Sequence, residues 1–178
     1  MAITINGSGT VSGMTAAPNL ATSGLVTGKI LNVVQTHLTT EVALTGNDWD
    51  DVTGLTVAIT PSSASSKILF MTSVDWAGGV YGKVKFQVDI GGGGYNDFAL
   101  PAADGNRTPT HLNHSCYNNE SDKANGNFIY LHSPNTTSTV TYKTLGYGTM
   151  RVNYPGNGAN SGSYAQGSSN LIAWEIAA

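Results

Sequence analysis

Residues 51–74 read DVTGLTVAITPSSASSKILFMTSV, and this stretch predicts two β-strands joined by a turn. Its first half alternates apolar with small or polar residues, the period of a half-buried strand; the apolar set is Leu55, Val57 and Ile59. Pro61 lacks a backbone N–H and ends the ladder, and the run 62–66 has the small polar residues of a surface turn. The segment 67–74 has apolar residues on both faces, so we expect it to be covered on both sides. Such a hairpin indicates a β-sandwich.

Strand patterns recur along most of the chain, and no segment shows a convincing helical period. Nine segments are predicted as strands: 29–44, 55–60, 67–74, 82–90, 95–100, 128–132, 138–144, 149–154 and 170–176. In 82–90 we expect Val84, Phe86, Val88 and Ile90 to face inward. Residues 47–51 and 101–127 are predicted as loops, and Gly146–Gly148 as a break. Strands at this spacing are typical of a sandwich or jelly roll, with the last strand beside an early one.

The composition excludes several classes of protein. Only 11% of the 178 residues are charged, against roughly 25% in an average soluble domain. The net charge is −3 and no lysine or arginine cluster occurs, so we expect no nucleic-acid partner. A single cysteine, Cys116, rules out an intrachain disulfide framework.

Two regions differ in their capacity to fold alone. Residues 1–27 are poor in charge and rich in Gly, Ser, Thr and Ala, so we predict an extended N-terminal arm that becomes ordered against a partner. Its apolar anchors are Ile3, Ile5, Val11 and Met14. Residues 28–178 are predicted as the β-sandwich domain. We expect neither a secretory signal nor membrane insertion, because the arm lacks a basic start and the chain lacks a long apolar run.

Two groups of side chains resemble metal ligands without forming a known pattern. They are His111 and His114 with Cys116, and the acidic group Asp48, Asp50 and Asp51. The first lacks the further ligands of a zinc site, and the second lacks the glycine and distal glutamate of a calcium-binding loop. Hydrogen-bonding loop histidines and a solvated turn are the favoured interpretations. No catalytic motif is present, so we predict no enzyme activity and no cofactor.

Aromatic residues in or beside Gly- and Asn-rich loops are the one feature with binding potential. Tyr147, Tyr154 and Tyr164 are the candidate glycan-binding residues. The alternative is that they pack loop against loop or subunit against subunit, which we favour.

Five segments together resemble bacteriophage virion proteins, especially tail-fibre-like and virion-surface proteins of marine and cyanobacterial phages. They are ITINGSGTVSG (3–13), GKILNVVQT (28–36), DVTGLTVAITPSSASSKILF (51–70), SPNTTSTVTYK (133–143) and SSNLIAWEI (168–176). The resemblance implies a jelly-roll sandwich that assembles as a homotrimer on the virion, with no catalytic residues. The chain is short for a tail fibre, so a decoration protein or a short head or tail appendage fits better.

Two functional hypotheses follow. The first is a non-enzymatic virion structural protein, made in the host cytoplasm and attached to other virion proteins through its arm. The second is a carbohydrate-binding module that recognises a host surface glycan.

Overall fold

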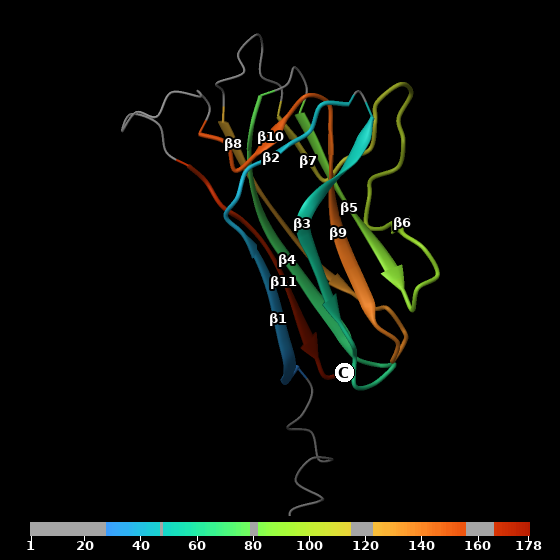
Figure 1. The fold of residues 1–178 in the computed structure, drawn as a ribbon. Coiled ribbons are helices and arrows are strands. Elements are labelled where there is room, and N and C mark those ends of the chain that lie inside the picture. The colour runs from blue at the N-terminus through green and yellow to red at the C-terminus, as the bar shows by residue number, and fades with distance from the viewer. Residues whose placement is uncertain (1–27, 47, 79–81, 115–122, 156–165) are drawn as a thin grey trace, which may run out of the picture.

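The computed structural model describes residues 28–46, 48–78, 82–114, 123–155 and 166–178. Every regular element in these ranges is a β-strand, and the strands form two antiparallel sheets packed together (Figure 1). This confirms the predicted all-β sandwich. The described part of the chain contains no helix that could span a membrane.

The first sheet brings the two ends of the domain together. Its strands are β1 (Ile30–Leu38), β2 (Val42–Ala43), β4 (Lys67–Ala77), β8 (Lys123–His132), β10 (Arg151–Val152) and β11 (Ser169–Ile176). The long strands lie in the order β1-β11-β4, and β8 pairs with the other side of β4. The short strands β10 and β2 extend the sheet beside the end of β4. As predicted, the last strand lies beside an early one.

The second sheet covers the inner face of the first. Its strands are β3 (Trp49–Ile59), β5 (Gly82–Ile90), β6 (Asn96–Asp97), β7 (Leu112–His114) and β9 (Val140–Tyr147). They lie in the order β3-β9-β5, and the short strands β6 and β7 pair with opposite ends of β5.

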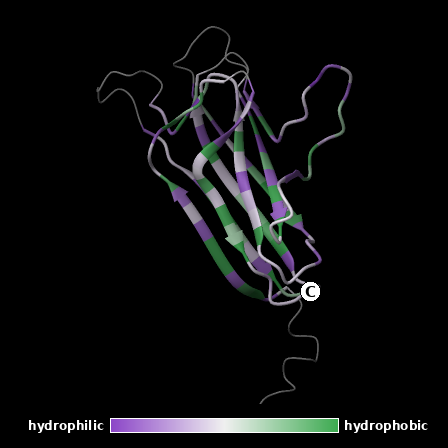
Figure 2. Cartoon of the chain, turned by 45° about the vertical axis from the view of Figure 1, so that its right-hand side comes forward, coloured by the Kyte–Doolittle hydropathy of each residue, from purple (hydrophilic) through white to green (hydrophobic). Residues whose placement is uncertain are grey.

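The core lies between the sheets and follows the predicted alternation, which Figure 2 shows as hydrophobic and hydrophilic residues alternating along the strands. The inward residues of β3, among them Leu55, are buried, and so are Val84, Phe86 and Val88 of β5. Ile90 is 39% exposed and is not buried with the other three, although the alternation continues to it. It is the last residue of β5, where the sheet ends.

Aromatic rings fill the part of the core between β4, β5, β8 and β9. The ring of Phe70 stacks on that of Tyr142, with centroids 4.7 Å apart, and Phe86 stacks on Phe128 at 5.6 Å. The hydroxyl of Tyr142 is 2.8 Å from Nδ1 of His132. The buried phenol therefore has a polar partner, as buried tyrosines usually do.

Three predicted loops or breaks are wrong because sheet pairing overrides local composition. Residues 49–51 belong to β3, which pairs with β9 on both sides of an irregularity that contains Gly54 at φ 84°. Strand β8 begins at Lys123, because β4 offers ten consecutive partners. Gly146 lies inside β9, paired with Val84. Conversely, the predicted strand 29–44 is divided into β1 and β2, and those at 95–100 and 149–154 shrink to two residues each.

Candidate functional site: an apolar sheet face and a lysine-bearing sheet face

The outer face of the first sheet is built from aligned apolar side chains. Two rows cross its four long strands. The first row is Val33, Trp174, Leu69 and Leu131, and the second is Gln35, Ile172, Met71 and Ile129. We call the seven hydrophobic members of these rows the apolar face. An outer sheet face in water normally carries polar residues, so this composition is unusual.

Exposure is highest toward the two edges of this face. Ile129 is 66% exposed and Leu131 46%, both on β8, and Val33 on β1 is 51% exposed. The residues of β4 and β11 in the two rows are half-buried. Segment 67–74 therefore has one face, including Ile68 and Phe70, in the core and the other, Leu69 and Met71, on the surface.

One step further along the strands the same surface becomes polar. The next row is His37, Asn170, Ser73 and Asn127. The apolar face is thus confined to the end of the sheet where β1 begins and β11 ends. There Gly28 N–H donates to the carbonyl of Ala177, and Ala177 N–H donates to that of Lys29, both at 2.9 Å. Gly28, the first described residue, therefore lies beside this end of the apolar face.

The outer face of the second sheet is polar and charged, and three of its lysines, Lys83, Lys85 and Lys143, lie over aromatic rings; we call these lysines and their rings the lysine face. The ammonium of Lys83 is 4.6 Å from the ring centre of Tyr147, that of Lys85 is 4.7 Å from Trp49, and that of Lys143 is 4.3 Å from Tyr95. In each pair the ammonium group itself lies over the ring face, the arrangement of a cation–π contact.

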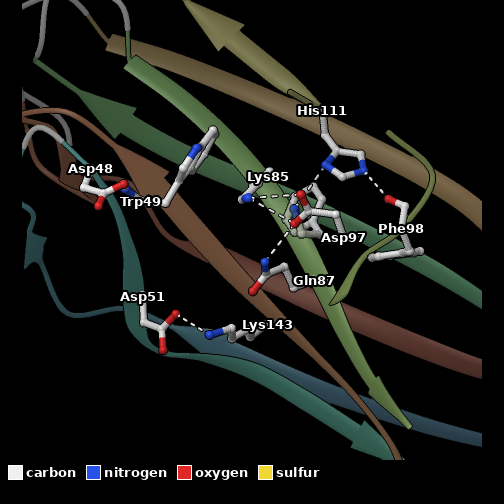
Figure 3. Close-up of polar contacts among 10 residues, drawn as sticks. Asp48, Trp49, Asp51, Lys85, Gln87, Asp97, Phe98, His111 and Lys143 are labelled. Atoms are coloured by element: carbon white, nitrogen blue, oxygen red, sulfur yellow. Dashed lines mark hydrogen bonds and ion pairs between the residues drawn. The ribbon is translucent and has the colours of Figure 1, made fainter. Parts of the chain in front are cut away.

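Two of these lysines also have carboxylate partners, as Figure 3 shows. Lys85 is 3.0 Å from Asp97, and Lys143 is 2.7 Å from Asp51. Burial opposes the ionisation of Asp97, but hydrogen bonds from Gln87 and Lys85 outweigh it and lower its pKa.

His111 is part of this network rather than a free ligand. Phe86 N–H donates to its Nδ1 at 3.1 Å, and its Nε2 is 2.9 Å from the carbonyl of Phe98 (Figure 3). Nδ1 is thus the acceptor and Nε2 carries the proton. Burial lowers the pKa of His111, although the bond to Phe98 opposes the shift. Both ring nitrogens are occupied, so His111 has no lone pair left for a metal.

The two groups of side chains that resemble metal ligands do not form a cluster in the described residues. No cluster of three or more metal-ligating side chains occurs there. His114 lies in β7 opposite Gly82, Asp48 accepts a hydrogen bond from the backbone of Trp49, and Asp51 pairs with Lys143. Cys116 lies outside the described residues.

The candidate glycan-binding tyrosines have different surroundings. Tyr147 lies on the lysine face, with its ring centre 5.5 Å from that of Trp49. Tyr154 is only 8% exposed, and the guanidinium of Arg151 lies 3.6 Å above its ring. Tyr164 and the arm residues Ile3, Ile5, Val11 and Met14 lie outside the described residues.

Sequence reasoning missed the role of Trp49, which was assigned to a loop, and the lysine–aromatic pairs. The alternation of 82–90 did place Lys83 and Lys85 on an outer face. Their aromatic partners come from other strands, so no local signal connects them. No family model matches this chain, and a search of curated proteins finds no match either.

Proposed function

We propose that this protein is a non-enzymatic structural subunit of a bacteriophage particle, a jelly-roll homotrimer on the virion surface attached through residues 1–27. The observation that supports this most is the apolar face. Seven hydrophobic side chains in two adjacent rows across four strands are costly to leave in water, since apolar surface gains roughly 25 cal/mol per Å² on burial. Extended apolar patches on soluble proteins usually mark interaction sites.

The strand order supports the jelly-roll assignment. The four long strands of the first sheet run β1-β11-β4-β8, and those of the second run β3-β9-β5 with β6 and β7 at the edge. Along the chain, the long strands pass alternately between the two sheets, except where β5 leads into β6 and β7. Two sheets connected in this way are typical of a jelly roll, the architecture of many viral capsid proteins.

A ring of three subunits needs contacts between two different patches of the same chain. The apolar face offers two such patches, because it reaches both edges of the sheet. Ile129 and Leu131 lie on the β8 edge, and Val33 on the β1 edge. Neither β1 nor residues 124–132 of β8 contain a lysine, arginine, aspartate, glutamate or proline. Such residues usually protect sheet edges from pairing.

Attachment through the arm is supported by where it joins the domain. Gly28 is anchored to Ala177 at the end of the β1–β11 ladder, so the sandwich begins at this end of the first sheet. An extended arm of 27 residues can span up to roughly 90 Å. It can therefore reach a neighbouring virion protein while the sandwich stays in a trimer.

Light scattering of the purified chain tests the assembly. We expect a trimer whose mass falls only on strong dilution, and a folded monomer for the double variant Ile129→Asn/Leu131→Asn. The matched control is Asn125→Ser/Asn127→Ser, which changes the polar part of the same face of β8 and should remain trimeric. A wild-type mass of one or two chains at all concentrations would overturn the trimer.

Deletion of residues 2–27 tests the attachment. We expect a folded trimer that no longer binds phage particles in a sedimentation assay. A deletion variant that still binds would contradict the arm's role, and one that is monomeric would show that the arm serves assembly instead.

A further inference from the structure

A pocket opens at the edge of the lysine face, beside β5. Its volume is about 710 Å³, and it lies between the strands β5 and β7 and the segment 101–110. The polar residues of its lining include Lys83, Asn106, Arg107, Thr108 and Asn113. Ligand pockets typically span ~300–1,000 Å³. The size suits one or two sugar rings rather than a metal ion.

Lys83 is the positive charge of the pocket that forms no ion pair with a described carboxylate. Its ammonium donates to the hydroxyl of Thr108 at 3.3 Å and lies over Tyr147. The other two lysines over aromatic rings each have an aspartate, whereas Lys83 has no carboxylate within ion-pair distance in the described part of the chain. Because no carboxylate of the described residues pairs with this ammonium, it favours an anionic ligand.

The other charged residues of the pocket, Arg107 and Asp104, do not remove the preference for an anionic ligand. Arg107 forms an ion pair with Asp104 across the short bridge that joins them, and both are largely exposed. Together with Lys83 the pocket has two positive charges and one negative. Arg107 has further N–H groups free to donate, because a guanidinium has five. The amides of Asn106 and Asn113 can both donate and accept, as binding of sugar hydroxyls requires.

The pocket continues into a row of side chains that crosses the second sheet. Strand register places Trp49, Tyr147, Lys83 and Asn113 opposite one another in this order on β3, β9, β5 and β7. Lys83 and Asn113 line the pocket, and the aromatic pair follows on the other side of Lys83. Aromatic rings beside hydrogen-bonding amides form an amphipathic surface, apolar on the ring faces and polar at the edges.

We propose that this pocket and the adjoining Tyr147–Trp49 pair bind an acidic saccharide, one with a carboxylate on its sugar ring. The carboxylate pairs with Lys83, the hydroxyls bond to Asn106 and Asn113, and a second sugar unit extends along the row past Lys83 toward the edge of Tyr147. A neutral saccharide leaves the ammonium unpaired. An inorganic phosphate would use neither the aromatic pair nor the length of the row. This proposal does not rest on the proposed virion role, because the site lies on the sheet opposite the apolar face.

Isothermal titration calorimetry with two acidic probes, trigalacturonate and sialyllactose, tests the proposal, with neutral galactotriose for comparison. We expect at least one acidic probe to bind at millimolar or lower concentration and galactotriose to give no signal. Lys83→Met should weaken binding by about tenfold or more, which corresponds to about 1.4 kcal/mol. Lys83→Arg keeps the charge and should retain binding.

Lys67→Met is the matched control, because Lys67 is an exposed lysine at the start of β4 in the other sheet. It removes the same charge and should leave affinity unchanged. Failure of both acidic probes to bind the wild type would overturn the proposal. An equal loss of affinity in Lys83→Met and Lys67→Met would also overturn it, because that result indicates general charge attraction. So would binding of galactotriose as tight as that of the acidic probes. Light scattering of the same samples measures how many chains assemble. It therefore shows whether a change in affinity comes with a change in assembly.

Discussion

The carboxylate of Glu175 accepts hydrogen bonds from the backbone N–H and the hydroxyl of Ser62, at 2.7 and 2.6 Å, although 113 residues separate the two. Glu175 is the penultimate residue of β11 and is buried. Burial opposes its ionisation, but hydrogen bonds from Ser62, Ser66 and Ser63 outweigh this and lower its pKa. The charge therefore ties the serine turn between β3 and β4 to the last strand.

Replacing Glu175 by glutamine should reduce the free energy of unfolding by about 1–3 kcal/mol. The amide oxygen can still accept, but hydrogen bonds to a charged group contribute more than neutral ones. Urea denaturation measures the change. The control is Glu41→Gln, which removes the ion pair of Glu41 with Arg151 near the surface and should cost less than about 1 kcal/mol. Equal losses of unfolding free energy in the two variants would show that the charge of Glu175 stabilises the fold no more than a surface ion pair does.

The same carboxylate makes stability depend on acid. Because the folded pKa of Glu175 lies below its ordinary value of 4.5, its contribution is fully present above that pH. It is lost as the pH falls through the folded pKa. Glu175→Gln should therefore flatten the fall of the unfolding free energy on the acid side, as measured by urea denaturation at several pH values. An unchanged acid-side slope in the variant would contradict this assignment.

Protonation of His111 and His132 should also weaken the fold as the pH falls, and this loss should begin at a higher pH than that of Glu175. Burial lowers the pKa of both below the ordinary 6.5, so the unfolded chain takes up protons before the folded chain does. Their contribution is complete above pH 6.5 and is lost as the pH falls below it. His132→Gln can still accept the hydroxyl of Tyr142 but does not titrate. It should show a smaller loss of thermal stability than the wild type between about pH 7 and pH 5. An equally steep loss would exclude His132 as a source.

Period-two alternation was enough to predict the strands that build the core. Leu55 and its alternate neighbours on β3 are buried, and so are the alternate residues from Val84 on β5, because each strand has one face toward the other sheet. Residues 123–127 contain two asparagines and a glycine and look like loop, yet they are strand because β4 provides backbone partners. Gly146 is strand for a similar reason. Pairing partners are remote in sequence, so composition does not reveal them.

The candidate sites depend even more on register. The hydrophobic residues of 67–74 indicated that a second face needs cover, and Leu69 and Met71 do lie on the outer side. Only the alignment of β4 with its neighbours shows that Trp174 and Leu131 flank Leu69 in one row. Similarly, Lys83 was recognisable as an outward residue, but its position opposite both Tyr147 and Asn113 follows from the sheet order.

Phe70 should be the most sensitive position of the aromatic core. Its side chain is fully buried and meets the rings of Phe86, Phe98, Phe128 and Tyr142. Phe70→Ala should cost about 3–5 kcal/mol of unfolding free energy, because the cavity cannot be refilled by rings held on three other strands. Ile129→Ala on the apolar face should cost less than about 1 kcal/mol when measured on the monomer. A comparable loss at the two positions would mean that β8 is part of the core rather than of a surface.

Gly146 offers a test of close packing within β9. A Cβ at this position would lie 2.4 Å from Cδ1 of Leu44 and 2.8 Å from Sδ of Met150, both buried. Gly146→Ala should therefore lower the unfolding free energy by about 1–3 kcal/mol, the usual cost of overpacking. Gly93→Ala is the control, since its added Cβ would meet only the carbonyl of Ile90 at 3.5 Å, and its effect should stay within about 1 kcal/mol. Thermal unfolding of both variants gives the comparison. If Gly146→Ala is as stable as the control, Leu44 and Met150 have room to move, and the contact between β9 and the segments bearing them is looser than the structure indicates.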